Sequence, residues 1–366
     1  MRILEINSVC GIRSTGRIAS EIAEKYINEG DQCIVASGRE TVPEKCAGYS
    51  VRIGGSFDVY SHFALSAVFD SHGFGSKRAT KKFLKWADEY DPDMLWLHNI
   101  HGYYINIEML FDWIKKRPDM KVRWTLHDCW AFTGHCTYFS YAGCDKWKTG
   151  CGNCPQKKEY PVSFIEDRSS RNFERKKKAF TGVKNMTLIT PSKWLAALVK
   201  ESFLKEYPVE VINNEIDKTV FKPTESDFKE RFGIENKKMI LGVASIWSRR
   251  KGLDDFIKLA GMLDDKYKIV IVGLTEKQME KMPVGILCIT RTNSAKELAG
   301  LYTAADVFVN PTYEDNYPTV NLEAKSCGTP VITYDTGGSV ESVEPGMIVG
   351  QGDVEALKRK IEEIVG

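Results

Sequence analysis

Acidic side chains surround the start of a short predicted helix in the segment from 310 to 338, NPTYEDNYPTVNLEAKSCGTPVITYDTGG. Pro318 suits the first turn of a helix because its missing N–H costs nothing there, and Gly328 suits the position just past the end. The unpaired backbone N–H groups at the start of such a helix, and the positive end of its dipole, attract anions. We therefore expect a helix over about 318–327 whose start binds a phosphorylated ligand such as a sugar nucleotide.

Glu323 lies about a turn and a half into this predicted helix. A carboxylate held there among apolar neighbours could accept both hydrogen bonds from a ribose diol. Glu314 and Asp315 stand just before the helix, next to the positive end of its dipole. The alternative is that these two acids only favour the helix start and that Glu323 is a surface charge.

A run of three cations follows a predicted strand at 239–244, in the segment SIWSRRKGLDDF. Arg250 and Lys251 stand beside Gly252 at the start of another helix, where they could neutralise a departing diphosphate. A cation in a partly dehydrated cleft could stabilise the transition state by several kcal/mol, on the order of 3 to 4 kcal/mol as for one oxyanion donor. A solvated charge run is the alternative.

Two residues of the first half could also contact a ligand. His127 ends a predicted strand at 122–127, and its imidazole could hydrogen-bond a sugar hydroxyl, although isolated histidines are often structural. Gly16 closes the loop CGIRSTG, where glycine lets the backbone approach a ligand; an ordinary turn is the alternative. The loop is neither G-x-G-x-x-G nor a Walker loop, so nicotinamide and ATP binding lose their main support.

Four cysteines follow one another at the spacing C-x7-C-x6-C-x2-C, with Cys129 and His135 just upstream. Thiolates this close could bind zinc tetrahedrally as a structural site, with no position left open for catalysis. The ligands would be Cys136, Cys144, Cys151 and Cys154. Unbound thiols are one alternative, and a redox or disulfide role is another.

Nearly continuous apolar strands alternate with helical stretches along the chain. One series runs from RILEI at 2–6 to MTLIT at 186–190, and a second runs from MILGVA at 239–244 to PVITY at 330–334. This alternation predicts an α/β protein with parallel sheets covered on both faces. A polar connector separates the two series, so we expect domains at 1–212, with a cysteine-rich insert at about 129–155, and at 213–366.

Composition narrows the functional classes. With 43% hydrophobic and 27% charged residues the chain reads as a soluble globular protein, and its net charge of +2 argues against nucleic acid as a partner. No apolar run reaches the ~18 residues that span a bilayer, and the first residues lack the pattern of a signal peptide. We therefore expect a cytoplasmic protein.

One basic segment could nevertheless bind a membrane surface. In KRATKKFLKWADEY, at 77–90, Ala79, Phe83 and Ala87 recur at helical spacing with lysines elsewhere on the wheel. Such a helix could rest against anionic lipid, which would place the protein peripherally on the inner face of the membrane. The alternative is a helix that faces the core and exposes a solvated basic side.

Taken in order, these motifs resemble those of the family 4 glycosyltransferases, retaining enzymes of the GT-B fold, over nearly the whole chain. The markers are the loop ending at Gly16, TLHD at 125–128, TPSKWLAALV at 190–199, VINNEID at 211–217, RRKG at 249–252 and LYTAADVFVNPTYEDNYPTVNLEAKSCGTPVI at 301–332. The cysteine-bearing insert is similar to that of a bacterial subgroup associated with surface polysaccharides. The resemblance implies two Rossmann-like, doubly wound domains facing across a cleft.

The resemblance also implies roles for individual residues. Of the family's E-x7-E pair, Glu323 fills the second place and would bind the donor ribose, whereas Asp315 fills the first, with Glu314 displaced by one residue. A basic pair would clamp the diphosphate, and the family's earlier arginine falls on Ser245, so we assign its role to Arg250. Further donor contacts are expected from Gly16, Asn316, Tyr317 and Thr319.

We therefore expect a retaining glycosyltransferase that moves a sugar from a nucleotide diphosphate sugar to a saccharide or lipid-linked saccharide. The expected catalytic residues are His127, Arg250, Lys251 and Asp315, with no obligatory catalytic metal. The alternative is a catalytically silent protein that binds a sugar or nucleotide and scaffolds a glycan assembly complex. A zinc-ribbon nucleic-acid protein is a third hypothesis, which the near-neutral charge opposes.

Overall fold

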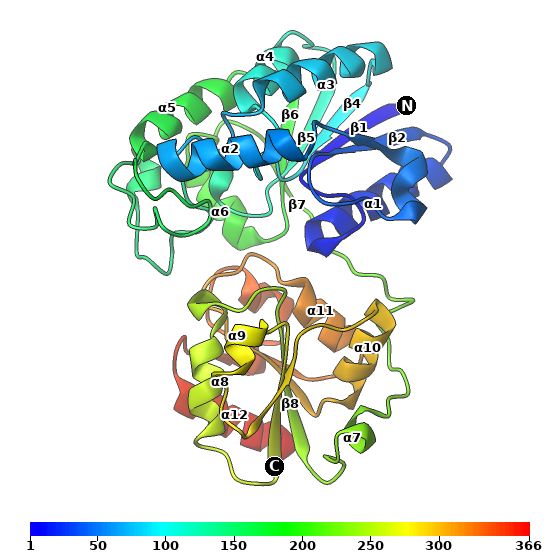
Figure 1. Ribbon diagram of the computed structural model, residues 1–366, viewed down its shortest axis with the longest axis vertical. Helices are drawn as coiled ribbons and strands as arrows, with labels where there is room; N and C mark the ends of the chain where they lie inside the picture. The colour runs from blue at the N-terminus through cyan, green and yellow to red at the C-terminus, as the bar shows by residue number, and fades with distance from the viewer. The chain divides into compact units, whose positions relative to one another are not determined.

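The computed structural model describes residues Met1–Gly366 and divides into two units, Met1–Asn213 and Asn214–Gly366 (Figure 1). Each unit is built around its own parallel sheet, with seven strands in the first and six in the second. The division falls one residue after the boundary expected from the sequence. No helix is both long enough and apolar enough to cross a membrane.

The first sheet has the strand order β3-β2-β1-β4-β5-β6-β7. Its strands are β1 Arg2–Asn7, β2 Gln32–Ser37, β3 Ser50–Arg52, β4 Met94–Leu97, β5 Lys121–Thr125, β6 Met186–Thr190 and β7 Val209–Val211. The chain builds outward from β1 in one direction and then returns to add β4 on the other side. The order therefore reverses between β1 and β4, which is where open sheets of this kind place their ligands.

Helices cover both faces of this sheet. They are α1 Arg13–Asn28, α2 Ser56–Phe69, α3 Lys77–Tyr90, α4 Ile107–Lys115, α5 Ser169–Phe180 and α6 Lys193–Glu201, with short 3-10 turns η1 Glu44–Tyr49, η2 Trp130–Phe132 and η3 Lys146–Lys148. Ala19 and Ala23 of α1 pack on one face, whereas Phe83 of α3, Phe111 of α4 and Phe180 of α5 belong to the core on the other. The apolar side chains of α1, α3, α4 and α5 thus pack on their own sheet.

The second sheet has the order β10-β9-β8-β11-β12-β13, so its direction of growth reverses between β8 and β11. Its strands are β8 Lys238–Val243, β9 Tyr267–Val272, β10 Ile286–Ile289, β11 Val307–Asn310, β12 Val331–Tyr334 and β13 Ile348–Val349. Its helices are α7 Phe228–Arg231, α8 Leu253–Ala260, α9 Glu276–Met279, α10 Ala295–Ala304, α11 Thr319–Ser326 and α12 Val354–Val365, with turns η4 Arg249–Lys251, η5 Ser339–Ser342 and η6 Pro345–Met347.

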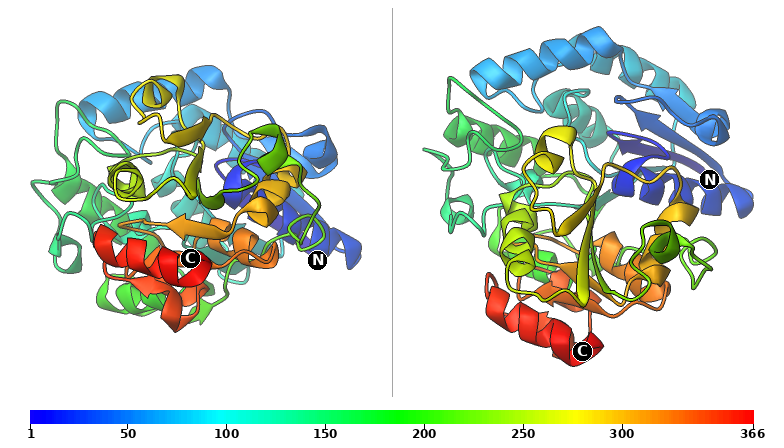
Figure 2. Two further views of the ribbon diagram at one scale, coloured as in Figure 1. Left: turned by 90° about the horizontal axis from the view of Figure 1, so that it is seen from below. Right: turned by 60° about the horizontal axis from the view of Figure 1, so that its bottom comes forward.

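Successive side chains of β8 point into different cores, one on each face of the second sheet. Ile240 packs with α8 and α12, which lie on the same face (Figure 2), whereas Met239 and Leu241 pack with α7, α10 and α11. This alternation follows from the two-residue repeat of a strand, since both faces of the sheet are buried. Nearly continuous apolar strands are therefore needed, and that is the pattern the sequence shows.

Three short strands, β3, β7 and β13, were not predicted from the sequence. Each forms an edge of its sheet and is only two or three residues long. Their sequences, SVR, VEV and IV, lack the apolar run that a central strand needs, because an edge strand is covered by fewer neighbours. The central strands agree with the predicted ones to within one or two residues.

The basic helix is present as predicted, but its apolar side is not available to lipid. Ala79, Phe83 and Ala87 of α3 are buried, and Phe83 lies in the core of the first unit. The expectation that these side chains rest on a membrane is therefore wrong. They pack on the sheet instead, and only the lysine-bearing side of α3 is exposed.

Candidate functional site

The expected donor residues of the second unit gather at the carboxyl ends of neighbouring strands. The loop after β8 leads into η4, and the segment after β11 leads into α11. Because β8 and β11 are adjacent and flank the reversal of strand order, these two segments lie side by side. This is the place where open α/β sheets bind their ligands.

Gly252 brings the cationic turn close to the segment after β11. Its φ is +75°, and a Cβ at this position would lie 2.1 Å from the carbonyl oxygen of Pro311. Any other residue would therefore strain the backbone and push the two segments apart. The backbone N–H of Tyr313 donates to the carbonyl oxygen of Arg250 at 2.8 Å, which locks the contact.

The three adjacent cations have different surroundings. Nη1 of Arg250 donates to the carbonyl oxygen of Glu314 at 2.7 Å, and Nζ of Lys251 forms an ion pair with the Asp315 carboxylate. The Arg249 side chain is 82% exposed and pairs at 3.6 Å with Asp254, whose side chain is 58% exposed. Two of the three cations therefore face the predicted anion site, and the third does not.

Burial acts on the charge of Lys251. Its side chain is 23% exposed and that of Asp315 is 14% exposed. Desolvation lowers the pKa of Lys251, and the nearby Asp315 carboxylate opposes this change, whereas the Arg250 guanidinium reinforces it. The ion pair is thus partly withdrawn from water, where a charge interacts more strongly with a ligand.

The start of α11 is arranged by its own loop. Pro318 precedes the first helical residue, and no side chain caps the helix. The backbone N–H of Asn316 donates to Oδ1 of Asp315 at 2.9 Å, and Nδ2 of Asn214 donates to the carbonyl oxygen of Tyr317 at 2.8 Å. Thr319 is the first residue of the helix and is partly exposed. The sequence expectation for this helix agrees with the structure to within one residue at each end.

A glycine turn after β12 closes around the same loop. Gly337 has φ +51°, and a Cβ there would meet the carbonyl oxygen of Asp315 at 2.2 Å. The backbone N–H of Gly338 donates to that oxygen at 3.1 Å. The side chain of Thr336 donates to the carbonyl oxygen of Tyr313 at 2.8 Å. The turn therefore holds Asp315 in position from the side of β12.

Sequence reasoning missed a buried polar network beneath this loop. Nδ2 of Asn310 donates to Oδ1 of Asn321 at 2.9 Å, and Nδ2 of Asn321 donates to Ser342 at 2.8 Å. Oγ1 of Thr333 and Oγ of Ser339 share a hydrogen bond of 2.7 Å. The network ties the ends of β11 and β12 to α11 and η5. Asn310 at a strand end and Asn321 within an apolar helix were the available signals, because polar groups buried there need partners.

Glu323 is held inside the second unit. The residue is 1% exposed, and its Oε2 accepts a hydrogen bond of 3.0 Å from the hydroxyl of Tyr302 on α10. The interpretation of Glu323 as a surface charge is therefore wrong. Glu314, 2% exposed, is likewise a buried residue rather than a solvated acid.

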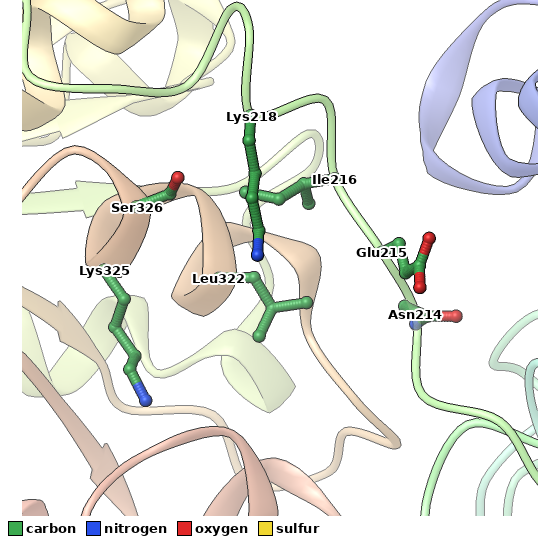
Figure 3. A pocket seen from close by; sticks show the side chains of 7 residues that line it. All are labelled: Asn214, Glu215, Ile216, Lys218, Leu322, Lys325 and Ser326. Carbon is green, nitrogen blue, oxygen red and sulfur yellow. The ribbon is translucent and has the colours of Figure 1, made fainter.

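A hollow of the second unit lies elsewhere on α11. Its volume is ≈ 670 Å³, and it is lined by the connector from Asn214 to Lys218 and by Leu322, Lys325 and Ser326 (Figure 3). None of the predicted donor residues lines it. This hollow therefore does not coincide with the predicted donor residues, which lie at the strand ends.

In the first unit His127 ends a chain of buried polar groups. Oε2 of Glu5 lies 3.0 Å from Nε2 of His98, and Nδ1 of His98 lies 3.1 Å from Nε2 of His127. Burial lowers the pKa of His127 to about 4, although the neighbouring Asp128 opposes the shift. The imidazole is therefore neutral near pH 7, which suits hydrogen bonding to a hydroxyl.

Gly16 lies within α1 rather than in the loop before it. A Cβ on this residue would meet Cγ2 of Val9 at 2.9 Å and the carbonyl oxygen of Val9 at 3.2 Å. The residue is buried. Within this unit, the absence of a side chain lets α1 pack tightly against the loop that follows β1. The expected approach of a ligand to Gly16 stays a prediction.

The four predicted zinc ligands lie in one part of the insert. Cys136, Cys144, Cys151 and Cys154 line a small cavity together with His135. All ten cysteines of the chain are free thiols. As they stand, no three His, Cys, Asp or Glu side chains form a ready-made metal-binding group. The predicted cluster of thiols is thus present, without the ligand geometry.

Among known proteins, the match to a family model lies almost entirely in the second unit. The family model described as Glycosyl transferases group 1 matches residues 210–365. The chain is 24% identical over 364 residues to the putative colanic acid biosynthesis glycosyl transferase WcaC of Escherichia coli K12. The aligned region covers 94% of this chain and 85% of that protein. The chain is 31% identical over 127 residues, 32% of this chain and 33% of the other, to the N,N'-diacetylbacillosaminyl-diphospho-undecaprenol alpha-1,3-N-acetylgalactosaminyltransferase of Campylobacter jejuni.

Solved structures share the fold over almost the whole chain. The structure of Alr3699/HepE from Anabaena in complex with UDP-glucose superposes with a TM-score of 0.66 at 15% identity, covering 99% of this chain and 89% of that one. Such a likeness at low identity concerns the fold alone. Together with the two doubly wound sheets it confirms the predicted α/β fold of the GT-B class.

Proposed function

We propose that this chain, whose residues 210–365 match the family model of group 1 glycosyl transferases, moves a sugar from a nucleoside diphosphate sugar to a saccharide or lipid-linked saccharide with retention of anomeric configuration. The observation that carries the proposal is the placement of Arg250 and Lys251 against the loop of Asp315. Two cations beside the start of α11 form a site for a group with two negative phosphates.

In the proposed reaction the departure of the nucleoside diphosphate limits the rate. The bond between the anomeric carbon and the phosphate oxygen breaks, and the acceptor oxygen forms a new bond on the same face. The acceptor proton passes to the departing phosphate oxygen, so that no protein nucleophile is needed. Arg250, Lys251 and the backbone N–H groups of Tyr317 and Thr319 stabilise the charge that develops on the diphosphate.

This assignment makes a divalent metal unnecessary for catalysis, because the protein supplies the positive charge itself. Asp315 orients Lys251 and contacts the donor sugar. Glu323 binds the donor ribose through a carboxylate that Tyr302 orients. His127 of the first unit donates or accepts a hydrogen bond with a sugar hydroxyl while neutral.

The relatives support a role in polysaccharide biosynthesis. One is named for colanic acid biosynthesis, and the other for transfer to a sugar carried on diphospho-undecaprenol. HepE binds UDP-glucose with the same fold. We assign the same class of donor to this chain and a lipid-linked saccharide as its acceptor.

A lipid-linked acceptor would require the protein to reach a membrane surface. The first unit exposes a group of apolar side chains on α2 and the loop after Tyr160: Phe57 is 83% exposed, Tyr60 73%, Phe164 65% and Ile165 67%. The backbone N–H of Phe164 donates to the carbonyl oxygen of Ala67 at 2.7 Å, which joins this loop to the end of α2.

Cations border this apolar surface. Nζ of Lys157 donates to the carbonyl oxygen of Ile165 at 3.0 Å, and the Arg168 guanidinium lies over the ring of Phe69, 5.2 Å from its centroid. Exposed aromatic groups beside cations suit the interface of an anionic bilayer. We therefore assign membrane contact to this surface in place of α3.

Vesicle flotation tests the membrane assignment. The wild-type protein should float with vesicles rich in phosphatidylglycerol and much less with phosphatidylcholine. A double variant, Phe57→Ser with Tyr60→Ser, should lose flotation, whereas Val284→Ser, which changes a fully exposed apolar residue of the second unit, should keep it. Equal recovery of all three proteins would remove the assignment.

Nucleotide release tests the proposed function directly. Incubation with UDP, GDP, ADP and CMP forms of several sugars, with and without lipid-linked saccharide extracts, should show acceptor-dependent release of one nucleotide. Release should persist in a chelator. A protein that binds a sugar nucleotide in a thermal-shift assay but transfers nothing to any acceptor would instead support the silent scaffold.

A further inference from the structure

The insert of the first unit contains a small cavity surrounded by metal-binding side chains. His135, Cys136, Cys144, Cys151 and Cys154 line it, and its free volume of ≈ 10 Å³ is about the space of one water-sized sphere. Phe132, Phe139 and Trp147 pack into an aromatic cluster beside it. The cavity therefore has no room for a substrate.

His135 is the most informative of these residues. Its side chain is fully buried, and its Nδ1 lies 2.6 Å from Oδ1 of Asp70, the residue that ends α2. Its Nε2 is buried and has no hydrogen-bond partner. A buried polar atom without a partner destabilises the fold, so an occupant of the cavity that binds the lone pair of this nitrogen would remove that cost.

A carboxylate on Nδ1 is what a metal-binding histidine usually has. By accepting the Nδ1 proton, Asp70 holds the imidazole in the tautomer whose Nε2 carries the lone pair. Asp70 is itself fixed, because its Oδ2 accepts the backbone N–H of Arg168 at 2.8 Å and its carbonyl oxygen accepts Nδ2 of Asn172 at 2.6 Å. The orientation of His135 is therefore set before any ligand binds.

Three thiols are placed around the same cavity. Cys136 and Cys154 are hydrogen-bonded to each other, and Sγ of Cys151 accepts the backbone N–H of Gly134 at 3.2 Å. A Cβ on Gly134 would lie 2.8 Å from Cβ of Cys151 and 2.0 Å from the carbonyl oxygen of Ser169. Glycine is thus required for the segment bearing His135 to approach Cys151.

A buried cation lies beside these thiols. Lys176 of α5 is 1% exposed, and its Nζ donates to the carbonyl oxygens of Trp130 at 2.8 Å and Thr133 at 3.0 Å. It interacts electrostatically with Cys136 and Cys151. These two hydrogen bonds to carbonyl oxygens hold the Lys176 ammonium group close to the thiols, where it could balance the negative charge of thiolates.

We propose that this cavity is a structural Zn²⁺ site whose four ligands are Nε2 of His135 and the thiolates of Cys136, Cys151 and Cys154. Binding releases one proton from each of three thiols and forms three Zn–S bonds and one Zn–N bond. The complex carries one negative charge, which Lys176 balances. Asp70 is a positioning residue that acts through His135.

This ligand set differs from the four thiolates that the sequence spacing suggested. The spacing of cysteines cannot reveal His135 as a ligand. The contact with Asp70, which holds the imidazole in the tautomer with a lone pair on Nε2, exists only in the folded chain. Cys144 lines the cavity as well, and we place His135 before it among the four ligands because Nε2 of His135 is buried without a partner. In the absence of metal, Cys136 and Cys154 are joined by a hydrogen bond. Binding of zinc therefore requires both thiols to turn toward the ion.

Metal analysis of the full-length, untagged protein, purified in reductant without added zinc, tests the site. We expect about one zinc per chain, lost on prolonged chelation together with a fall in the unfolding temperature of the first unit. Cobalt added to the metal-free protein should produce the thiolate-to-cobalt absorption of a tetrahedral site.

Single variants identify the ligands. Cys136→Ser, Cys151→Ser, Cys154→Ser and His135→Ala should each lose zinc, and Asp70→Asn should weaken zinc binding about 10–100-fold without removing a ligand. Cys144→Ser and Cys288→Ser of the second unit serve as matched controls and should keep the metal. Circular dichroism of Asp70→Asn distinguishes weakened binding from failure to fold.

Three results would overturn the proposal. Wild-type protein with no zinc and an unfolding temperature that a chelator leaves unchanged would remove the site. A native mass that reveals a Cys136–Cys154 disulfide after anaerobic purification would replace it with a redox pair. Loss of zinc in Cys144→Ser with retention in His135→Ala would restore the four-thiolate set and refute the histidine ligand.

Discussion

Lys251 forms an ion pair with Asp315 although the two residues lie 64 positions apart in the chain. The pair joins the turn after β8 to the loop after β11 at the point where the strand order of the second sheet reverses. Asp315 thereby fixes the position of an ammonium group that a diphosphate would need. The acid of the pair is part of the cationic site and not a separate feature.

The three adjacent cations should differ in their effect on catalysis. Arg250→Ala and Lys251→Ala should each lower kcat about 10²–10³-fold, as the loss of one preorganised donor to a developing anion does. Arg249→Ala should change kcat less than about threefold, because that side chain is exposed and pairs with a solvated acid. Steady-state kinetics with the identified donor measures all three, and equal losses would show that the charge run acts through its total charge.

Asp315 rather than Glu314 should be the acid that matters for transfer. Asp315→Asn keeps the shape of the side chain but removes the charge that holds Lys251, so we expect kcat to fall at least about tenfold. Glu314→Gln keeps the carbonyl oxygen that Arg250 binds and should leave donor kinetics within about threefold. The reverse order of effects would assign the donor contact to Glu314.

Tyr302 should act on donor binding through Glu323. Tyr302→Phe removes the hydroxyl that donates to the buried carboxylate, and we expect the donor KM to rise about three- to tenfold with kcat little changed. Glu323→Ala should raise the donor KM further. Lys325→Ala, on the side of α11 that lines the hollow of Figure 3, is the control and should leave KM unchanged. An unaltered KM in Glu323→Ala would refute the ribose contact.

The first unit should lose stability in mild acid. Burial lowers the pKa of His62 and of His127 to about 4 and the pKa values of His72 and His98 well below the usual range. The unfolded chain, with histidine pKa values near ~6.5, then takes up protons that the folded chain refuses. Stability is therefore fully present above about pH 6.5 and is lost as the pH falls toward 4.

One group opposes this trend. Burial raises the pKa of Glu5 well above its usual value, so the folded state takes up that proton more readily than the unfolded state. Four histidines with lowered pKa values act against this single carboxyl group, so the net effect of acid is a loss of stability. All six histidines of the chain lie in the first unit. Hydrogen exchange at about pH 7.5 and about pH 5 should thus show faster opening in residues 1–213 only. Equal or slower exchange there at the lower pH would contradict the prediction.

The predictable part of the fold rested on local patterns. Continuous apolar segments such as 239–244 are typical of central strands of a covered parallel sheet, so the alternation of strands and helices was predictable. Pro318 and Gly328 bracketed α11 because each residue has a backbone preference of its own. The short edge strands β3, β7 and β13 carry no such pattern, since fewer neighbours bury them.

The candidate site was predictable where function depends on residue type and position in one segment. RRKG and the segment around Asp315 could be recognised from the sequence, and Arg250 and Lys251 were selected from it, but the exposure of Arg249 could not be read from residue type. That distinction depends on Gly252, whose positive φ brings the turn against Pro311. The apolar stripe of α3 likewise suggested lipid until its burial in the core was known.

By itself, the sequence determined the class of fold, the two-unit organisation and the group of residues that could clamp a diphosphate, because these depend on periodicity and residue type. Tertiary structure alone decided which partners those residues meet. Lys251 with Asp315, Tyr302 with Glu323, and Asp70 with His135 are contacts between segments distant in the chain. The physical reason is that burial and pairing set the charge and orientation of a polar group, and both are properties of the packed chain.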